Sequence, residues 1–114
     1  IYVGDYGNHK VRKINSNGVV TTFAGSADNY LYPLGIAIDS SGSIYLAEFP
    51  TLVIRKISSA GVISMIAGSG SKGCVDGIGT TASFSRPTGI AVDNKGTIYI
   101  GDGGCNKIRK ITLQ

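Results

Sequence analysis

Hydrophobic residues occur along this 114-residue chain in short runs that turn-forming residues separate. The clearest stretch has such runs at residues 35–39, 44–48, 53–57 and 62–67. Gly, Ser, Asn and Asp lie between the runs and β-branched residues are frequent within them, which is typical of short strands joined by turns. No segment has a sustained apolar stripe at helical spacing. The pattern predicts an all-β fold.

The same order of residues occurs three times. Each unit has an Ile-Tyr pair followed by an Arg-Lys-Ile segment, and the three arginines are Arg12, Arg55 and Arg109. The first two are 43 residues apart and the last two are 54 apart, and the extra 11 residues lie between Gly68 and Pro87. A period of this length indicates stacked supersecondary units.

Each complete unit is predicted to contain four strands. The inner strands, at 35–39 and 89–93, are apolar on both faces, so we expect both faces to be buried. Small sheets packed face to face around an axis satisfy this expectation. The sequence therefore predicts a partial β-propeller of four-stranded antiparallel blades, about two and a half blades and ten strands in all.

Several motifs resemble those of the NHL-repeat family. They are Asp5–Ile14 with its Asn8-His9 pair, Val20–Gly25, Pro87–Asp93 and Gly96–Ile100. The second unit departs from the pattern at residues 48–52, and the third has Cys105-Asn106 in place of Asn8-His9. The resemblance implies an NHL-type propeller. It also implies two known kinds of activity in the family, RNA binding through a basic face, and lyase or hydrolase chemistry at metal and His ligands around the axis.

The predicted blades and one inserted loop account for most of the chain. Residues 1–26 form an incomplete blade, 33–68 a full blade, 69–86 an inserted loop and 87–114 a second incomplete blade. Because propellers typically close with 4 to 8 blades, we expect these residues, 1–114, to be a fragment of one longer NHL-repeat propeller. The sequence has no apolar run of 18 residues, so no membrane span is predicted.

The net charge of +4 raises the question of nucleic acid. Eight of the 11 basic residues are at repeat positions, which favours a scaffold role, and only Lys72, Arg86 and Lys95 lie elsewhere. We therefore expect nucleic acid not to be the partner, although a usable basic surface stays an alternative. The repeat arginines Arg12, Arg55 and Arg109 are predicted to brace the acidic residues Asp5, Glu48 and Asp102. Asp39 and Asp93 are predicted to cap turns.

Cys74 and Cys105 are the two cysteines of the chain. Their loops emerge on the same face of the predicted propeller, so a disulfide between them is geometrically plausible. Such a bond implies an oxidising compartment, and with it an extracellular, secreted or cell-surface protein. Two unrelated free thiols are the alternative.

No catalytic residue, metal ligand or cofactor is predicted. His9 is the single histidine and has no Ser or Cys partner at a motif spacing, so a structural contact in its loop is the better account. Two cysteines and one histidine are also too few for a zinc site. An enzyme of the lyase or hydrolase kind would need its ligands in other blades.

The interpretation that fits best is a non-catalytic protein-interaction or structural module. Its partner would be another protein or neighbouring domains of the same chain. We expect the binding surface to come from loops that differ between units and carry aromatic rings. The residues assigned to this partner-binding face are Tyr6, Asn8, His9, Tyr30, Tyr32, Phe49, Leu52 and Phe84. Rings that only pack the loops onto the blades are the alternative.

Overall fold

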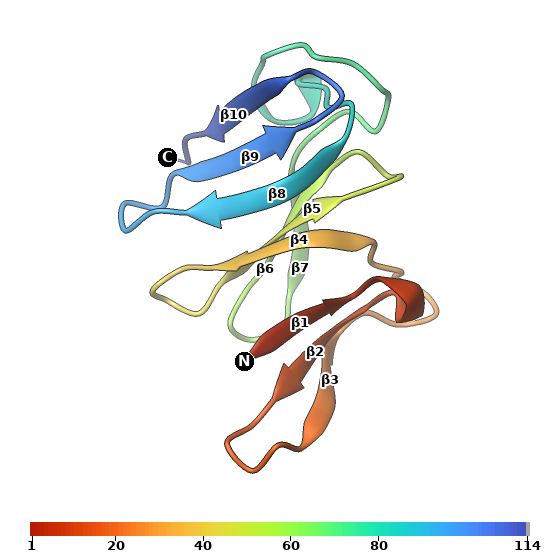
Figure 1. Ribbon diagram of the computed structural model, residues 1–114, viewed down its shortest axis with the longest axis vertical. Helices are drawn as coiled ribbons and strands as arrows, with labels where there is room; N and C mark the ends of the chain where they lie inside the picture. The colour runs from red at the N-terminus through yellow and green to blue at the C-terminus, as the bar shows by residue number, and fades with distance from the viewer. Residues whose placement is uncertain (114) are drawn as a thin grey trace.

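The computed structural model describes residues 1–113, which form ten β-strands in three antiparallel sheets (Figure 1). The first sheet contains β1 (Tyr2–Asp5), β2 (Lys10–Ile14) and β3 (Val20–Ala24). The central sheet contains β4 (Pro33–Ile38), β5 (Ile44–Glu48), β6 (Ile54–Ile57) and β7 (Ile63–Ala67). The third sheet contains β8 (Pro87–Val92), β9 (Ile98–Asp102) and β10 (Lys107–Ile111). Residue 114, the last of the predicted third blade, lies outside the described residues.

The described helices are two short 3-10 turns, η1 (Tyr6–Asn8) and η2 (Gly79–Thr81). No helix within residues 1–113 has the length and apolar character that crossing a membrane requires.

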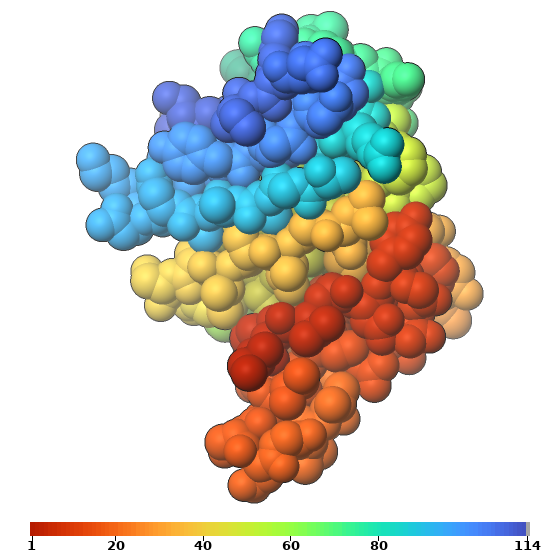
Figure 2. All heavy atoms as spheres, in the orientation of Figure 1, coloured from red at the N-terminus to blue at the C-terminus, as the bar shows by residue number. Residues whose placement is uncertain are grey.

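The three sheets are stacked face to face like the blades of a fan, as Figures 1 and 2 show. Equivalent residues occupy equivalent places in the three sheets, because Arg12 pairs with Val3, Arg55 with Leu46 and Arg109 with Ile100. The all-β prediction and the partial propeller of ten strands are confirmed.

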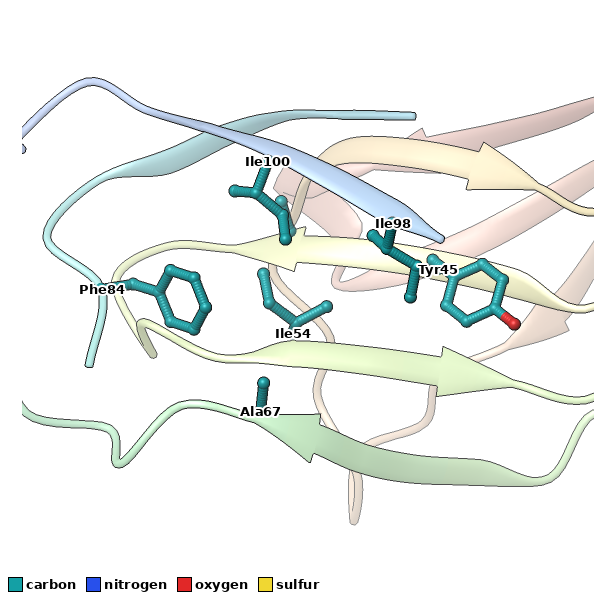
Figure 3. Packing of buried hydrophobic residues seen from close by; sticks show 7 residues of the cluster. Tyr45, Ile54, Ala67, Phe84, Ile98 and Ile100 are labelled. Atoms are coloured by element: carbon teal, nitrogen blue, oxygen red, sulfur yellow. The ribbon is translucent and has the colours of Figure 1, made fainter. Parts of the chain in front are cut away.

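The central sheet is covered on both faces, and β5 shows this best. Side chains alternate between the two faces of a strand. Ile44 and Leu46 accordingly join the core shared with the first sheet, whereas Tyr45 and Ala47 join the core shared with the third sheet (Figure 3). All five residues of β5 are buried. Burial on both faces explains why Ile44–Glu48 has no outward-facing polar position before its final glutamate.

The inner strands are more exposed than the sequence suggests. Leu34 and Ile38 of β4 are 43% and 48% exposed, and Gly89 and Ala91 of β8 are exposed as well. The expectation that both inner strands are buried on both faces is therefore wrong for the described residues. The physical reason is their place in the sheets, since each forms the edge of its sheet and lacks a partner strand on one side.

Asp39 and Asp93 cap the turns that follow the inner strands, as predicted. One Asp39 oxygen accepts hydrogen bonds from the backbone N–H groups of Ser41 and Ser43, at 3.0 and 2.9 Å. Burial works against ionisation of Asp39, but these bonds and that from the Ser41 hydroxyl outweigh it, so the pKa is lowered. The backbone N–H of Thr97 similarly lowers the pKa of Asp93.

The inner strands β4 and β8 approach so closely that glycine is required at one point. A Cβ atom on Gly35 would overlap the carbonyl oxygen of Thr88 and lie 3.2 Å from a methyl carbon of Ile90. Gly89 occupies the same repeat position in β8, and a Cβ atom there would meet no atom within 4 Å. The two glycines thus form a matched pair that differs in whether a neighbouring strand lies close to the added atom.

The substitution Gly35→Ala should lower the free energy of unfolding by roughly 2 kcal/mol or more, because the added methyl group forces β4 and β8 apart. Gly89→Ala is the control and should leave stability unchanged or raise it by up to about 1 kcal/mol, since alanine loses less conformational entropy on folding. Denaturant unfolding of both variants measures the difference. Equal effects of the two substitutions would contradict the close approach.

Candidate functional site

One end of the propeller carries the loops that differ most between the repeats, and these lie to the right in Figure 1. We call this end the loop face. It consists of residues 6–9, 26–32, 49–53, 68–86 and 103–106, which connect β1 to β2, β3 to β4, β5 to β6, β7 to β8 and β9 to β10. The short turns at the other end of the strands form the opposite face.

An ion pair between residues seven positions apart recurs in each sheet beneath the loop face, and we call it the acid–arginine clamp. The three clamps are Asp5 with Arg12 (3.2 Å), Glu48 with Arg55 (2.9 Å) and Asp102 with Arg109 (3.3 Å). The pairing predicted from the repeat is present in all three sheets. The carboxylates of Glu48 and Asp102 are fully buried, whereas that of Asp5 is 29% exposed.

In two sheets the buried carboxylate also holds the loop that leads into the inner strand. Glu48 accepts a hydrogen bond from the backbone N–H of Tyr32 at 3.0 Å. Asp102 accepts two, from the N–H groups of Ser85 (3.1 Å) and Arg86 (2.8 Å). One carboxylate therefore joins three strands of its sheet, since it lies at the end of the second strand, binds the arginine of the third and anchors the start of the first.

The departures from the NHL pattern include the residue three positions after each clamp acid. The contact that this residue makes differs from sheet to sheet. Asn8 donates to Asp5 at 2.8 Å and is the main cause of the lowered Asp5 pKa. Thr51 donates to Glu48 at 3.1 Å in the same way. In the third sheet this position is Cys105, which lies in a disulfide, and the acid there bonds to two backbone N–H groups in place of a side chain.

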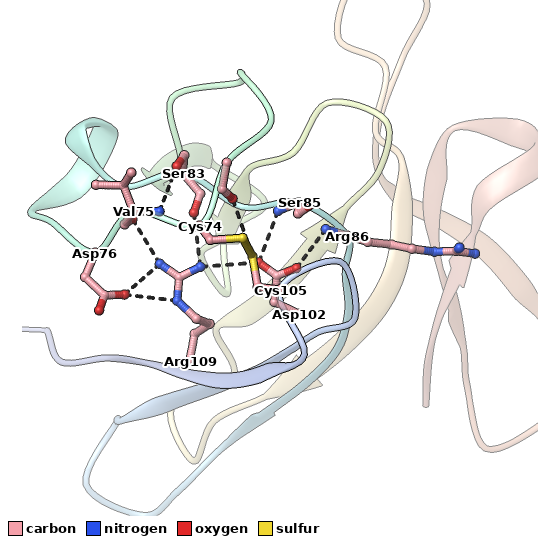
Figure 4. The surroundings of a disulfide bond; sticks show 10 residues. Cys74, Val75, Asp76, Ser83, Ser85, Arg86, Asp102, Cys105 and Arg109 are labelled. Atoms are coloured by element: carbon pink, nitrogen blue, oxygen red, sulfur yellow. Dashed lines mark hydrogen bonds and ion pairs between the residues drawn. A yellow bond between two sulfur atoms is a disulfide. The ribbon is translucent and has the colours of Figure 1, made fainter.

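The predicted disulfide between Cys74 and Cys105 is present, with the two Cα atoms 5.8 Å apart. It ties the inserted loop to the loop between β9 and β10 (Figure 4).

Arg109 lies beside this bond and is 7% exposed. Its guanidinium donates to Asp76 (2.8 and 3.1 Å) and to the carbonyl oxygens of Val75 (3.0 Å) and Ser83 (3.1 Å). It also lies over the ring of Phe84, 4.9 Å from the centroid. Arg109 therefore contacts the insertion both before its 3-10 turn η2, at Val75 and Asp76, and after it, at Ser83 and Phe84.

Four aromatic side chains meet on the loop face above the first and central sheets. The His9 ring stacks on Tyr30 with centroids 4.5 Å apart and meets Tyr32 edge-on at 4.8 Å, and Tyr6 meets Tyr32 at 6.3 Å. The His9 Nδ1 atom lies 3.2 Å from the carbonyl oxygen of Leu31, which fixes the ring. Tyr30 is nevertheless 50% exposed and Tyr6 38%. We call these four residues the aromatic cluster.

The aromatic cluster continues toward the third sheet through Phe49 and Arg86. The backbone N–H of Phe49 bonds to the carbonyl oxygen of Tyr32, and the guanidinium of Arg86 lies 5.9 Å from the centre of the Phe49 ring. Figure 4 shows the Arg86 side chain pointing away from the disulfide. Arg86 thus joins the exposed side chains of the loop face, although the sequence analysis did not assign it to the partner-binding face. The signal that the sequence offered for Arg86 was its position outside the repeat.

Two predicted residues of the partner-binding face are buried, so their assignment as direct contacts is wrong. Phe84 is 2% exposed because its ring fills the core between the central and third sheets (Figure 3). Leu52 is 8% exposed. Asn8 is exposed, but its side-chain amide is already bonded to Asp5. The sequence could not separate these residues from exposed ones, because apolar loop residues look alike in either role.

No group of three His, Cys, Asp or Glu side chains in residues 1–113 is placed to hold a metal ion.

Replacing both Cys74 and Cys105 by alanine should lower the free energy of unfolding by roughly 3 to 4 kcal/mol, the value expected for opening a cross-link that closes a loop of this size. Hydrogen exchange should become faster in residues 69–86, while the core strand β5 is affected only through global unfolding. Mass spectrometry of the exchanged peptides separates the two effects. Unchanged stability and unchanged exchange in the insertion would show that the Arg109 contacts alone hold the loop.

Comparison with known proteins identifies one repeat directly. The family model for the NHL repeat matches residues 84–110, which include β8, β9 and most of β10. No curated protein matches the chain.

Solved structures resemble the whole chain. A protein of unknown function from Bacteroides thetaiotaomicron is 28% identical, with a TM-score of 0.84 over 96% of this chain and 31% of its own. An auxiliary nutrient binding protein from the same organism is 18% identical, with a TM-score of 0.78 over 97% of this chain and 34% of its own. Virginiamycin B lyase from Staphylococcus aureus is 19% identical, with a TM-score of 0.67 over 97% of this chain and 33% of its own.

The chain thus spans about a third of the length of these structures. The repeated clamps and the stacked antiparallel sheets are consistent with the NHL-repeat match at residues 84–110. Residues 84–110 match the NHL repeat, and the chain as a whole has the fold of a partial β-propeller similar to these structures.

Proposed function

We propose that this chain is a non-catalytic binding module whose loop face contacts a protein partner. The observation that carries the proposal is the continuous row formed by the aromatic cluster, Phe49 and Arg86. These side chains are held by contacts with one another, and yet Tyr6, Tyr30 and Arg86 stay exposed. Residues 1–26, 33–68 and 87–114 would act as three successive blades that support the row, with 69–86 as an inserted loop.

The chemistry of the row favours a protein over other partners. Tyrosine and arginine are the residue types that most often anchor protein interfaces, because they bury large areas and also form hydrogen bonds. Rings that are already stacked lose little conformational entropy on binding. Three of the four arginines, the residue type that best matches a phosphate group, are engaged in clamps and are not free to bind one.

The disulfide supports a place outside the reducing cytoplasm. Disulfides persist in oxidising compartments, so we assign the module to a larger extracellular or cell-surface protein. The structural similarity to auxiliary nutrient binding proteins of two Bacteroides species is compatible with a binding role at such a location.

An enzyme is the second candidate, because the fold is shared with virginiamycin B lyase. That similarity, at 19% identity, concerns the fold alone. Within residues 1–113, His9 is stacked and bonded to a carbonyl oxygen, and no carboxylate or thiol lies near it in the observed contacts. A catalytic role would therefore depend on residues outside this chain.

The double substitution Tyr6→Ala and Tyr30→Ala tests the proposal in the full-length protein. Immobilised protein is exposed to the secreted and cell-surface proteins of its own source, and the retained partner is identified by mass spectrometry and titrated back as a purified protein. The variant should bind that partner at least tenfold more weakly, since truncating one interface anchor commonly costs about 2 kcal/mol.

Val62→Ala is the matched control, because Val62 is 65% exposed and follows a turn of the opposite face. It should leave the affinity unchanged. Equal affinity of the wild type and the tyrosine variant, or an equal loss in the control, contradicts the proposal. Turnover of a small molecule that survives the tyrosine substitutions would favour the enzyme instead.

A further inference from the structure

The insertion begins with an exposed segment of small and polar residues, 69–72, which ends in Lys72. Just before it, the backbone N–H of Gly68 donates to the carbonyl oxygen of Gly79 at 3.1 Å. The hydrogen bonds of Ser71 are local, since both of them are with the hydroxyl group of Ser69. Within residues 1–113, Lys72 has no hydrogen bond at all. The backbone of this segment is therefore open along its length.

Lys72 differs in this respect from the other basic residues of the chain. Eight of them lie in the strands β2, β6 and β10, where backbone pairing holds the chain. The backbone N–H of Arg86 donates to Asp102 at 2.8 Å, and that of Lys95 donates to Asp93 at 2.9 Å in a tight turn. Exposed loops of small polar residues are the preferred sites of proteolytic cleavage. Lys72 is thus the basic residue most open to a protease.

The residues that follow Lys72 are held firmly. The backbone N–H of Gly73 donates to the carbonyl oxygen of Phe84 at 3.1 Å, and Cys74 is joined to Cys105 (Figure 4). A protease binds the chain in an extended conformation on both sides of the bond that it cleaves. One side of the bond between Lys72 and Gly73 is open, but the other side is locked.

The disulfide is the part of this lock that a change of conditions can open. Cys74 is exposed and Cys105 is half-buried, so a thiol in solution can reach the bond. Access is one of the factors that set the rate of thiol–disulfide exchange. The contacts of Val75 and Asp76 with Arg109 are noncovalent and can open locally once the disulfide is broken.

We propose that the peptide bond between Lys72 and Gly73 is a processing site for a protease that cleaves after basic residues, and that the Cys74–Cys105 disulfide controls this cleavage. A thiol reductant converts the disulfide into two cysteine thiols and is itself oxidised to a disulfide. The insertion then opens locally, and residues on both sides of the bond extend into the protease. Hydrolysis adds one water molecule across the bond, which gives Lys72 a carboxylate and Gly73 an amino group.

The cleaved chain stays assembled, because the cut lies outside the core. Tyr45 and Ile54 in the part before the cut pack in one cluster with Phe84, Ile98 and Ile100 in the part after it. Cleavage therefore produces two parts of one propeller that noncovalent contacts hold together. The aromatic cluster lies on the loops 6–9 and 26–32, so this proposal does not depend on the partner-binding role of the loop face.

Limited digestion of the full-length protein with trypsin tests the proposal. One sample is first reduced with dithiothreitol and alkylated, so that trypsin itself meets no reductant, and the other stays oxidised. Mass spectrometry follows cleavage after Lys72 and, as an internal reference, after Lys56 in the central strand β6. Reduction should speed cleavage after Lys72 at least about tenfold and leave Lys56 protected, because the rate follows the population of the locally open form.

Three variants complete the test. The double variant Cys74→Ala and Cys105→Ala should be cleaved after Lys72 at the fast rate without reduction. Lys72→Gln should abolish this cleavage, whereas the matched control Lys95→Gln should leave its rate unchanged.

Two kinds of result would overturn the proposal. The first is an equal rate of cleavage after Lys72 in the oxidised and reduced proteins, or no cleavage there in either. The second is an equal acceleration after Lys56, because it would show that reduction unfolds the central sheet and does not open the insertion alone.

Discussion

A buried carboxylate that faces an arginine is the interaction on which the loop face depends. In the central and third sheets the carboxylate is fully buried, and burying a charge without partners costs several kcal/mol. Glu48 and Asp102 offset this cost with an arginine and with backbone N–H donors from the loop before the inner strand. A loop that moved away would leave the charge unsatisfied, so the loops stay in place although they lack regular structure.

The clamp lets the loops differ while the blades remain alike. Asn8 and Thr51 meet the same need at the same position, and in the third sheet the insertion supplies two N–H groups instead. This substitution frees Cys105 to form the disulfide. The insertion is therefore part of the scaffold. The neighbouring aromatic cluster lies on a loop surface whose backbone is held by the clamps beneath it.

The sequence predicted those parts of the structure that the repeat specifies, and it missed contacts and burial that depend on how the chain packs. The repeat itself revealed the sheets and the clamp between Arg109 and Asp102, because spacing within a repeat unit reports register. It could not reveal the contact between Arg109 and Asp76, which lies outside the repeat. Burial of Phe84 was missed for a related reason, since only the packed core shows whether a loop ring points inward. The exposure of β4 was missed because its place at the edge of a sheet depends on how the strands pair, which the hydrophobic pattern of a single strand does not show.

Hydrogen exchange in the Asp102→Asn variant tests the role of the clamp most directly. Asparagine keeps the size of the side chain but removes the charge that Arg109 and the N–H groups of Ser85 and Arg86 share. The account predicts at least tenfold faster exchange in residues 73–86 with little change in β5, and a much smaller effect of Asp5→Asn, whose carboxylate is partly exposed. Unchanged exchange in residues 73–86 of the Asp102→Asn variant would contradict it.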